Sequence, residues 1–285
     1  MKIMKIIFVA VFNYNSTNVS QADGFRRNGC EVIEFNYREI AARYGNQQRD
    51  EMLVTLCLKE KADAVVFSKC NEIAHKVVEE CNKVSKTVLW YMDTVGGNFN
   101  DSLIQKIKLC NFTFCALQEP LREAQKIGGN KVFFLHEGYD HTSNYPVKTG
   151  YKRNVCFIGH PRGWRADYIN ALNIPIIQNA YGKEHSQVVC ETKINLNFTQ
   201  GGTSDRTYKV LASKGFLLTE PWDGMEEDFE IGIDFDIFKN IDELREKIDY
   251  YLKNDDIRLR IAEHGYQTVQ KFDRINWAKK IIEKL

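Results

Sequence analysis

The sequence lacks most of the features that would assign it to a specialised class of protein. It has five prolines in 285 residues, no low-complexity tract and no internal repeat. Nowhere do about 18 apolar residues follow one another, so no transmembrane helix is expected. Its 39 basic and 38 acidic residues nearly cancel, which excludes an overall charge that would attract nucleic acid or an anionic membrane.

Cysteine pairs of the kind found in redox and zinc sites are also absent. Eight cysteines are present, but none forms a CxxC motif, and most lie within apolar runs such as Val155–Phe157. We therefore expect buried free thiols that act as small hydrophobic side chains. Residues 1–13 carry no small-residue cleavage site of a signal peptide, so the expected location is the cytoplasm.

The first half of the chain alternates short apolar runs with amphipathic stretches. Such alternation predicts parallel strands joined by helices. The strands are expected at 3–12, 31–35, 64–67, 87–91, 112–116 and 131–135, and the helices at 19–28, 49–61, 71–83, 101–109 and 119–127.

The alternation pauses over residues 136–151, a polar stretch with glycine and proline, and then begins again. Strands are expected at 155–158, 174–177, 194–198, 216–219 and near 236–238, and helices at 165–172, 205–214, 241–253, 257–271 and 275–282. A chain of 285 residues with 44% hydrophobic and 27% charged residues can fill two cores. The sequence thus predicts an α/β protein with two Rossmann-like domains facing across a cleft. Residues 1–140 form the first domain, 152–272 the second, and 273–285 a C-terminal helix.

The most informative segment, residues 195–220, reads as strand, glycine loop, helix and strand. In open α/β sheets ligands lie beyond the carboxyl ends of the strands, and free N–H groups at a helix start attract anions. Arg206 adds a bidentate donor suited to phosphate, and the next strand delivers Glu220 to the same edge. The simpler alternative is a tight turn with a solvated arginine. The loop and helix residues expected to contact the ligand are Thr199, Gly202, Thr203, Ser204, Asp205, Arg206, Tyr208 and Lys209.

Residues 206–219 resemble the donor-site signature of CgeB-type, spore-maturation-like glycosyltransferases. The resemblance extends to 155–160 and, through paired helices, to about residue 280. It implies the GT-B fold and a nucleotide-sugar donor, with the second domain binding the donor. It also implies that the helix at 273–285 packs back on the first domain. Members of that family usually carry a glutamate for the donor ribose where this chain has Lys209, and a lysine cannot accept those hydrogen bonds. Either a neighbour such as Glu220 takes over, the donor differs, or the site is degenerate.

The loop after the strand at 155–158 holds further donor-binding candidates. Its arginines can reach a diphosphate from the side opposite Arg206, although a plain turn with surface arginines is the alternative. Trp164 and Tyr181 can stack on a base or a sugar, but such aromatics more often pack. The candidates here are Gly159, His160, Arg162, Arg165 and Tyr181.

Two residues of the first domain are candidates for catalysis. Asp93 ends a strand before a loop and could act as a general base on an acceptor hydroxyl; a structural aspartate is the alternative. His136 lies where GT-B enzymes often place hinge residues that contact the donor, or is a core histidine. No histidine or carboxylate cluster has the spacing of metal ligands, so no metal is expected.

The resulting hypothesis is a metal-independent glycosyltransferase without a bound cofactor. It would move a sugar from a nucleoside diphosphate sugar, of which a UDP-sugar is the first choice, to a hydroxyl acceptor. The sequence leaves open whether the acceptor is a protein, a glycan, a small molecule or a modified nucleic acid. The alternative, suggested by Lys209, is a non-catalytic nucleotide- or sugar-binding adaptor on a GT-B scaffold.

Overall fold

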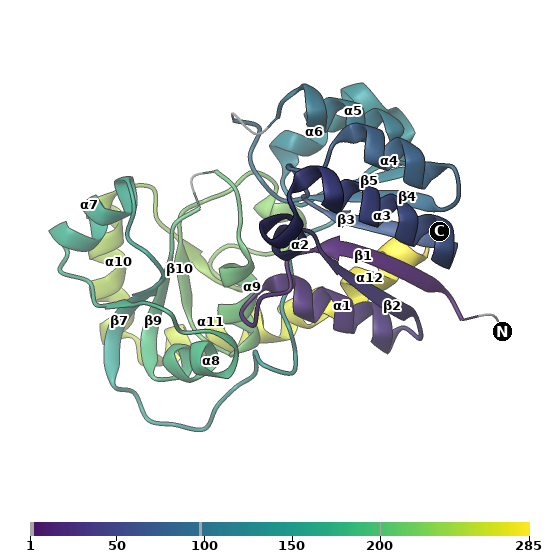
Figure 1. Cartoon of the computed structure of the whole chain (residues 1–285). Helices are drawn as coiled ribbons and strands as arrows, with labels where there is room; N and C mark the ends of the chain where they lie inside the picture. Colours follow the sequence, from purple (N-terminus) through teal and green to yellow (C-terminus); the bar gives the residue numbers. More distant parts are fainter. Residues whose placement is uncertain (1–2, 97–98, 200) are drawn as a thin grey trace. The chain divides into compact units, whose positions relative to one another are not determined.

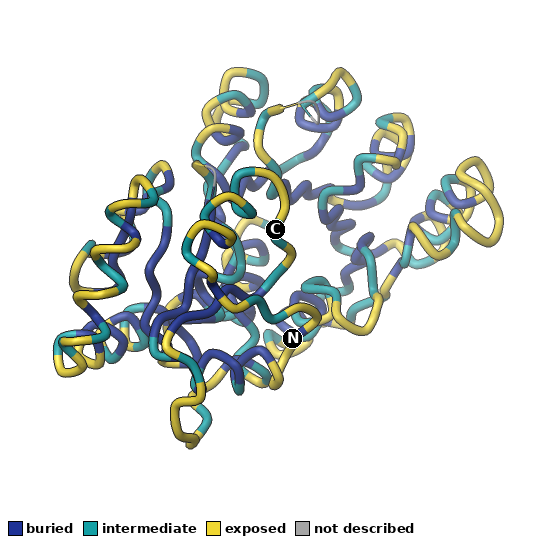
Figure 2. Tube along the Cα trace, turned by 90° about the vertical axis from the view of Figure 1, so that its left-hand side faces the viewer, coloured by how far each residue is buried: buried dark blue, intermediate teal, exposed yellow. Residues whose placement is uncertain are grey.

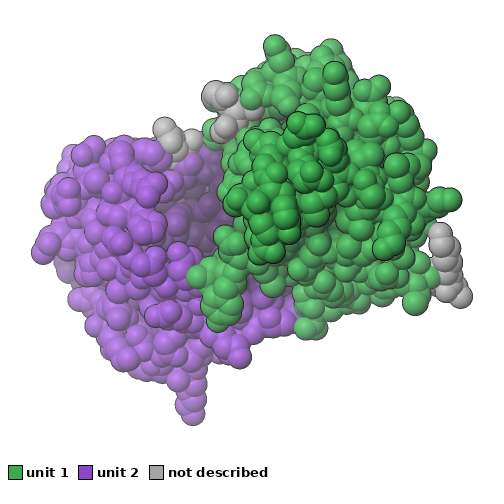
Figure 3. Space-filling view, in the orientation of Figure 1, with its two compact units in different colours: residues 1–137, 274–285 green, residues 138–273 purple. Residues whose placement is uncertain are grey.

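A computed structural model describes residues 3–96, 99–199 and 201–285 (Figure 1). The chain divides into two compact units, coloured separately in Figure 3. Unit 1 comprises residues 1–137 and 274–285, and unit 2 comprises residues 138–273. Each unit has its own parallel sheet with helices on both faces, as expected for two Rossmann-like domains.

Unit 1 contains a six-stranded parallel sheet in the order β2-β1-β3-β4-β5-β6. Its strands are β1 (Lys5–Ala10), β2 (Glu31–Asn36), β3 (Ala64–Ser68), β4 (Lys86–Tyr91), β5 (Phe112–Cys115) and β6 (Val132–Phe134). Its helices are α1 (Thr17–Arg27), α2 (Tyr37–Tyr44), α3 (Asn46–Glu60), α4 (His75–Asn82), α5 (Asp101–Leu109), α6 (Gln118–Gly128) and α12 (Arg274–Ile282), with a 3₁₀ turn at Gly129–Lys131.

Alternate side chains along the strands of unit 1 fill two cores, one on each face of the sheet. Helices α3 to α6 cover one face, and α1 and α12 cover the other. The indole of Trp277 in α12 meets the rings of Phe25 and Trp90 edge to face, with centroids 5.5 and 5.3 Å apart. The final helix is thus an integral part of the core of unit 1.

Unit 2 contains a five-stranded parallel sheet in the order β11-β10-β9-β7-β8. Its strands are β7 (Arg153–Ile158), β8 (Ile176–Ile177), β9 (Thr192–Asn197), β10 (Leu217–Thr219) and β11 (Asp236–Ile237). Its helices are α7 (Trp164–Ala171), α8 (Gly182–Cys190), α9 (Asp205–Ala212), α10 (Ile241–Lys253) and α11 (Asp255–Val269), with 3₁₀ turns at Met225–Glu227 and Gln270–Phe272.

The sheet of unit 2 also has a core on each face. Helices α8 and α9 cover one face, α7 and α10 cover the other, and α11 contributes to both. Figure 2 shows buried strands inside and exposed helix faces outside. Each parallel sheet is covered on both sides, so the carboxyl edge of the strands, with its loops, is where a ligand can reach the backbone.

All eleven expected strands are present, but two helices were not expected and one begins later than expected. Helix α2 follows β2 with no intervening loop, and α8 occupies a stretch rich in polar residues. The helix expected from residue 71 begins at His75 and follows a turn in which Lys69 and Cys70 have left-handed backbones with φ of 62° and 52°. The buried ammonium of Lys106 donates to the Cys70 carbonyl at 2.7 Å and so holds this turn.

Candidate functional site

The carboxyl ends of β7, β9 and β10 lie side by side at one edge of the unit 2 sheet. This follows from the strand order and from the parallel pairing of β9 with both neighbours. The loop from Gly159 follows β7, the loop from Thr199 leads from β9 to α9, and Glu220 directly follows β10. Most of the candidates chosen from the sequence are therefore brought to one edge.

Arg206 lies at the first turn of α9 and reaches across this edge. Its Nη1 donates to Asn197 Oδ1 at 2.8 Å, and its guanidinium carbon lies 4.8 Å from the ring centroid of Phe157. Burial lowers the pKa of Arg206 to about 10. The negative charge of Asp205 opposes this shift, and the positive charge of Arg165 makes a smaller contribution to the lowering. The side chain remains a cation at neutral pH, but a cation removed from water.

Arg165, in the first turn of α7, is the second cation of the edge. Its guanidinium stacks on the Trp164 ring, 4.9 Å from the centroid, and its Nε is buried without a hydrogen-bond partner in the part of the chain that the structure describes. Across residues 3–96, 99–199 and 201–285, no carboxylate lies within ion-pair distance of the guanidinium of Arg165 or Arg206. Two mutually repelling guanidinium groups thus share one edge without a direct ion pair to a carboxylate among the described residues, and a bound anion would stabilise this arrangement.

Gly159 provides the space that Arg206 occupies. Its backbone has φ of 148°, and a Cβ placed there would lie 2.8 Å from Arg206 Nη2 and 3.1 Å from Phe157 Cζ. A side chain at this position would displace the guanidinium as well as strain the backbone. The glycine after β7 therefore sets the position of the arginine that follows β9.

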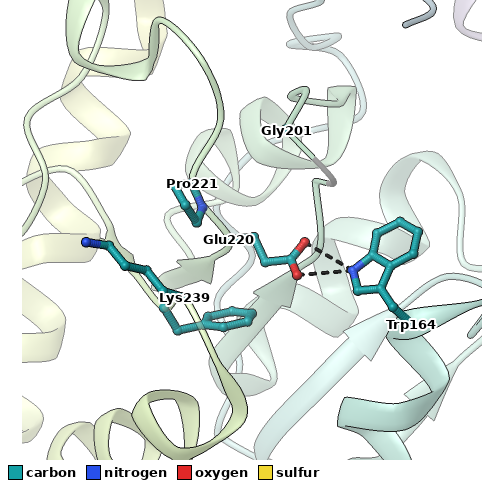
Figure 4. Close-up of a pocket in the computed structure, with 6 residues that line it drawn as sticks. Trp164, Gly201, Glu220, Pro221 and Lys239 are labelled. Atoms are coloured by element: carbon teal, nitrogen blue, oxygen red, sulfur yellow. Dashed lines mark hydrogen bonds between the residues drawn. The ribbon is translucent and has the colours of Figure 1, made fainter. Parts of the chain in front are cut away.

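Glu220 links the ends of three strands. Its carboxylate accepts the backbone N–H of Thr199 at 2.8 Å and the indole N–H of Trp164 at 3.1 Å (Figure 4). These groups border a pocket of about 380 Å³. The lining residues are Trp164, Gly201, Glu220, Pro221, Phe238 and Lys239.

The loop between β9 and α9 is shaped largely by its own hydrogen bonds. The Gly202 N–H donates to the Thr199 carbonyl at 3.1 Å, and Thr203 Oγ1 donates to Thr207 Oγ1 at 3.2 Å. Ser204 is the N-cap residue of α9, but its hydroxyl makes no capping bond. This Oγ is buried and has no partner within the described segments. The amino end of α9 thus presents a polar group that a bound anion could use.

Three candidates on or near α9 have surroundings that the sequence did not reveal. Lys209 Nζ lies 2.5 Å from Asp205 Oδ2, so these two residues pair with each other. The ring of Tyr208 is 1% exposed and packs edge to face on Phe272, which leaves almost no surface for a ligand. The ring of Tyr208 is thus part of the core of unit 2, and its contact with a ligand stays a prediction.

His185 in α8 lies near the candidate site but was not among the residues chosen from the sequence, because α8 itself was not expected. The side chain is 6% exposed, and burial, followed by the charge of Lys209, lowers its pKa to about 3. It is a neutral imidazole beside charged residues of α9.

The remaining candidates of unit 2 are exposed. Tyr181, the N-cap residue of α8, is 45% exposed, and its hydroxyl donates to Asn179 Oδ1 at 3.4 Å. His160 and Arg162 are exposed in the loop before α7.

The fold of the chain matches that of several solved structures, one of them described as a glycosyltransferase. HepE of Anabaena, solved with UDP-glucose, superposes with a TM-score of 0.67 at 11% identity over 98% of each chain. A glycosyltransferase of Rickettsia africae superposes with a TM-score of 0.67 at 14% identity, over 99% of this chain and 98% of that one. A sucrose-phosphate synthase of Thermosynechococcus elongatus gives 0.68 at 8% identity over 98% of each chain. Identities this low establish the two-domain GT-B fold alone.

Sequence comparison adds the activity class. Residues 143–283, just under half of the chain and nearly all of unit 2, match the family described as glycosyl transferase-like. The protein is a glycosyltransferase with a GT-B fold. No curated protein matches its sequence.

The two catalytic candidates of this glycosyltransferase both lie in unit 1. Asp93, which follows β4, forms an ion pair with the ammonium of Lys69, which follows β3. His136 is 5% exposed, and its Nε2 lies 3.4 Å from Lys280 Nζ in α12. Because these two residues lie on a different unit from the arginine pair, their roles stay predictions.

The described residues of the glycosyltransferase contain neither a metal-binding group nor a membrane-spanning helix. In the residues described, no three His, Cys, Asp or Glu side chains gather in a group that could hold a metal ion. No helix in the same residues combines the length and the apolar character needed to span a bilayer. Independence from metal stays a prediction.

Proposed function

We propose that this glycosyltransferase binds a nucleoside diphosphate sugar on unit 2 and transfers the sugar to the hydroxyl group of an acceptor without a metal ion. The observation that carries the proposal is the pair of guanidiniums of Arg165 and Arg206, which share the carboxyl edge of the sheet without a direct ion pair to a carboxylate among the residues described. A diphosphate has the charge and the oxygen geometry that such a pair would bind.

The same cations would stabilise the leaving group. In the transfer, the bond between the anomeric carbon and the diphosphate oxygen breaks, and a bond forms from that carbon to the acceptor oxygen. Negative charge develops on the departing diphosphate, where Arg165, Arg206 and the amino end of α9 supply positive charge and N–H donors. Groups held in place before the reaction can do this without a metal ion.

The donor is proposed to be a UDP-sugar. HepE, which shares the fold, was solved with UDP-glucose and, in another structure, with UDP and glucose. The finer resemblance to CgeB-type enzymes belongs to this proposal as well. Lys209 is paired with Asp205 and has no group that accepts hydrogen bonds, so the ribose hydroxyls must be bound elsewhere.

Acceptor binding is assigned to unit 1, with Asp93 as the candidate base that takes the proton of the acceptor hydroxyl. Its carboxylate is paired with Lys69, so an incoming hydroxyl would have to share or replace that contact. The acceptor could be a protein, a glycan, a small molecule or a modified nucleic acid.

A second candidate function is a nucleotide- or sugar-binding adaptor without turnover. The observation that favours it is Lys209, held by Asp205 where CgeB-type enzymes usually have a carboxylate. The adaptor and the enzyme both predict ligand binding, but only the enzyme predicts that the donor is consumed.

The two functions separate in one assay. Purified protein is first screened by thermal shift against nucleotides and nucleotide sugars, and the best donor is then incubated with and without EDTA while the release of nucleoside diphosphate is followed. We expect a nucleotide-dependent rise in melting temperature and slow donor hydrolysis that EDTA leaves unchanged. Binding without hydrolysis, even with candidate acceptors added, would favour the adaptor. No response to any nucleotide would contradict both.

A further inference from the structure

We propose that Asn197 is a positioning residue, which fixes the guanidinium of Arg206 and, because its amide is uncharged, leaves the positive charge of Arg206 available to the diphosphate. This inference rests on the proposed function, since it concerns the same phosphate site. It goes beyond that function because it gives a role to a side chain that the proposed donor site does not include. An aspartate would match the shape of Asn197 but not its charge.

Asn197 is the last residue of β9, and its side chain is fully buried. Its Oδ1 accepts a hydrogen bond from Arg206 Nη1 at 2.8 Å, and its Nδ2 donates to Thr207 Oγ1 at 3.1 Å. A guanidinium can only donate hydrogen bonds, so the amide oxygen has to face Arg206 and the amide nitrogen has to face Thr207. The orientation of the amide is therefore set by its two neighbours.

The groups that hold Arg206 in place are uncharged. Thr207 Oγ1, which accepts the hydrogen bond from Asn197, also accepts one from Thr203 Oγ1 at 3.2 Å, and both threonines are buried. The guanidinium carbon lies 4.8 Å from the ring centroid of Phe157. The side chain of Arg206 is thus held by an amide and an aromatic ring rather than by a carboxylate.

The charged side chains around Arg206 leave its guanidinium without a direct ion pair among the described residues. Asp205 precedes it in α9, but the carboxylate of Asp205 lies 2.5 Å from the ammonium of Lys209. In the same part of the chain, the bond to Asn197 is the only hydrogen bond of this guanidinium. A guanidinium has five N–H donors, so donors remain for the oxygens of a bound anion.

An amide suits this position better than a carboxylate does. A hydrogen bond to a neutral oxygen fixes the long side chain before the ligand arrives, so less conformational entropy is lost on binding. A carboxylate in the same place would fix the guanidinium as well, but its charge would compete with the diphosphate for the cation and repel the diphosphate. The neutral amide therefore gives the guanidinium its position without lowering its affinity for an anion.

The test compares two substitutions of Asn197 that separate charge from shape. Asn197→Asp keeps the shape, and it can keep both hydrogen bonds, because the hydroxyl of Thr207 can also act as a donor. Asn197→Ser is shorter and loses contacts, but it stays neutral. The dissociation constant of UDP is measured by calorimetry for the wild type and each variant, and thermal melting shows whether each variant is folded.

We expect Asn197→Asp to weaken UDP binding roughly 10-fold or more, and Asn197→Ser to weaken it by less than about fivefold. Since aspartate has the shape of asparagine, a role in shape alone would make the serine variant the weaker binder. Asn170→Asp is the matched control, because Asn170 is an exposed residue in the last turn of α7. This control should bind UDP within about twofold of the wild type.

The outcomes separate this inference from the proposed function. If the wild type binds UDP and folded Asn197→Asp binds it within about twofold as well, the inference is wrong and the proposed function stands. The same holds if Asn197→Ser binds UDP as weakly as Asn197→Asp does. Should Asn197→Asp fail to fold, a folded Asn197→Ser protein that loses more than about 10-fold in UDP affinity would overturn the inference. If the wild type binds no UDP, the proposed function fails, and the role of Asn197 fails with it.

Discussion

Replacement of Arg206 by alanine is expected to lower kcat/KM for the nucleotide-sugar donor by about 100- to 1,000-fold. The guanidinium is tied to Asn197 and packed on Phe157, so it is fixed before the donor binds. Its loss would remove a cation from the point where the leaving diphosphate gains charge. Steady-state kinetics of donor consumption measure the effect, and binding of UDP should weaken in parallel.

Because Arg206 is partly buried, its removal could also disturb the fold. Arg206→Met keeps an unbranched side chain over the Phe157 ring but removes the charge, and it should lose as much activity as the alanine variant while melting close to wild type. Arg245→Ala is the control for charge alone, since Arg245 is an exposed arginine of the same unit. Activity within about threefold of wild type in a folded Arg206→Met protein would contradict a role in phosphate binding.

Gly159→Ala is expected to lower activity by about 100-fold, although residue 159 itself makes no proposed contact with the donor. The new Cβ would lie 2.8 Å from Arg206 Nη2, so the guanidinium would have to move. A displacement near 1 Å of a positioning group can cost about 100-fold in rate. The measurement is kcat/KM for the donor, together with the melting temperature.

A matched glycine separates this clash from backbone strain. Gly232 also has a left-handed backbone, with φ of 80°, but a Cβ there would meet no atom within 4 Å. Gly232→Ala should therefore lower stability by about 1–2 kcal/mol and leave kcat/KM near wild type. If Gly159→Ala and Gly232→Ala lose the same small amount of activity, Gly159 does not position Arg206.

The strand pattern and the position of the glycine loop could be read from the sequence, because buried parallel strands are short apolar runs and the loops between them have a characteristic composition. The first helix not expected, α2, begins at Tyr37 directly after β2, and the side chain of its N-cap residue Asn36 makes no capping bond. The second, α8, begins with glycine and ends with two valines and a cysteine, all of them weak helix formers. Tertiary packing stabilises both helices, and packing is not visible in local sequence.

The surroundings of the candidate site could be predicted only in part. The pair Asp205 and Lys209 has the i, i+4 spacing of a helical ion pair, so their contact was open to prediction. Trp164 and Glu220 are separated by 56 residues, and only the strand order brings them together. Likewise, nothing local to Gly159 indicates that it makes room for Arg206. The sequence indicates which residue types lie at the edge, while the fold decides which of them meet.

The most direct test of the account is the crystal structure of the protein with UDP bound. The account predicts diphosphate oxygens within about 3.2 Å of the guanidiniums of both Arg165 and Arg206, beside the amino end of α9. Density for the diphosphate elsewhere in the molecule, with these two guanidiniums making no contact to it, would contradict the claim that they form the donor phosphate site.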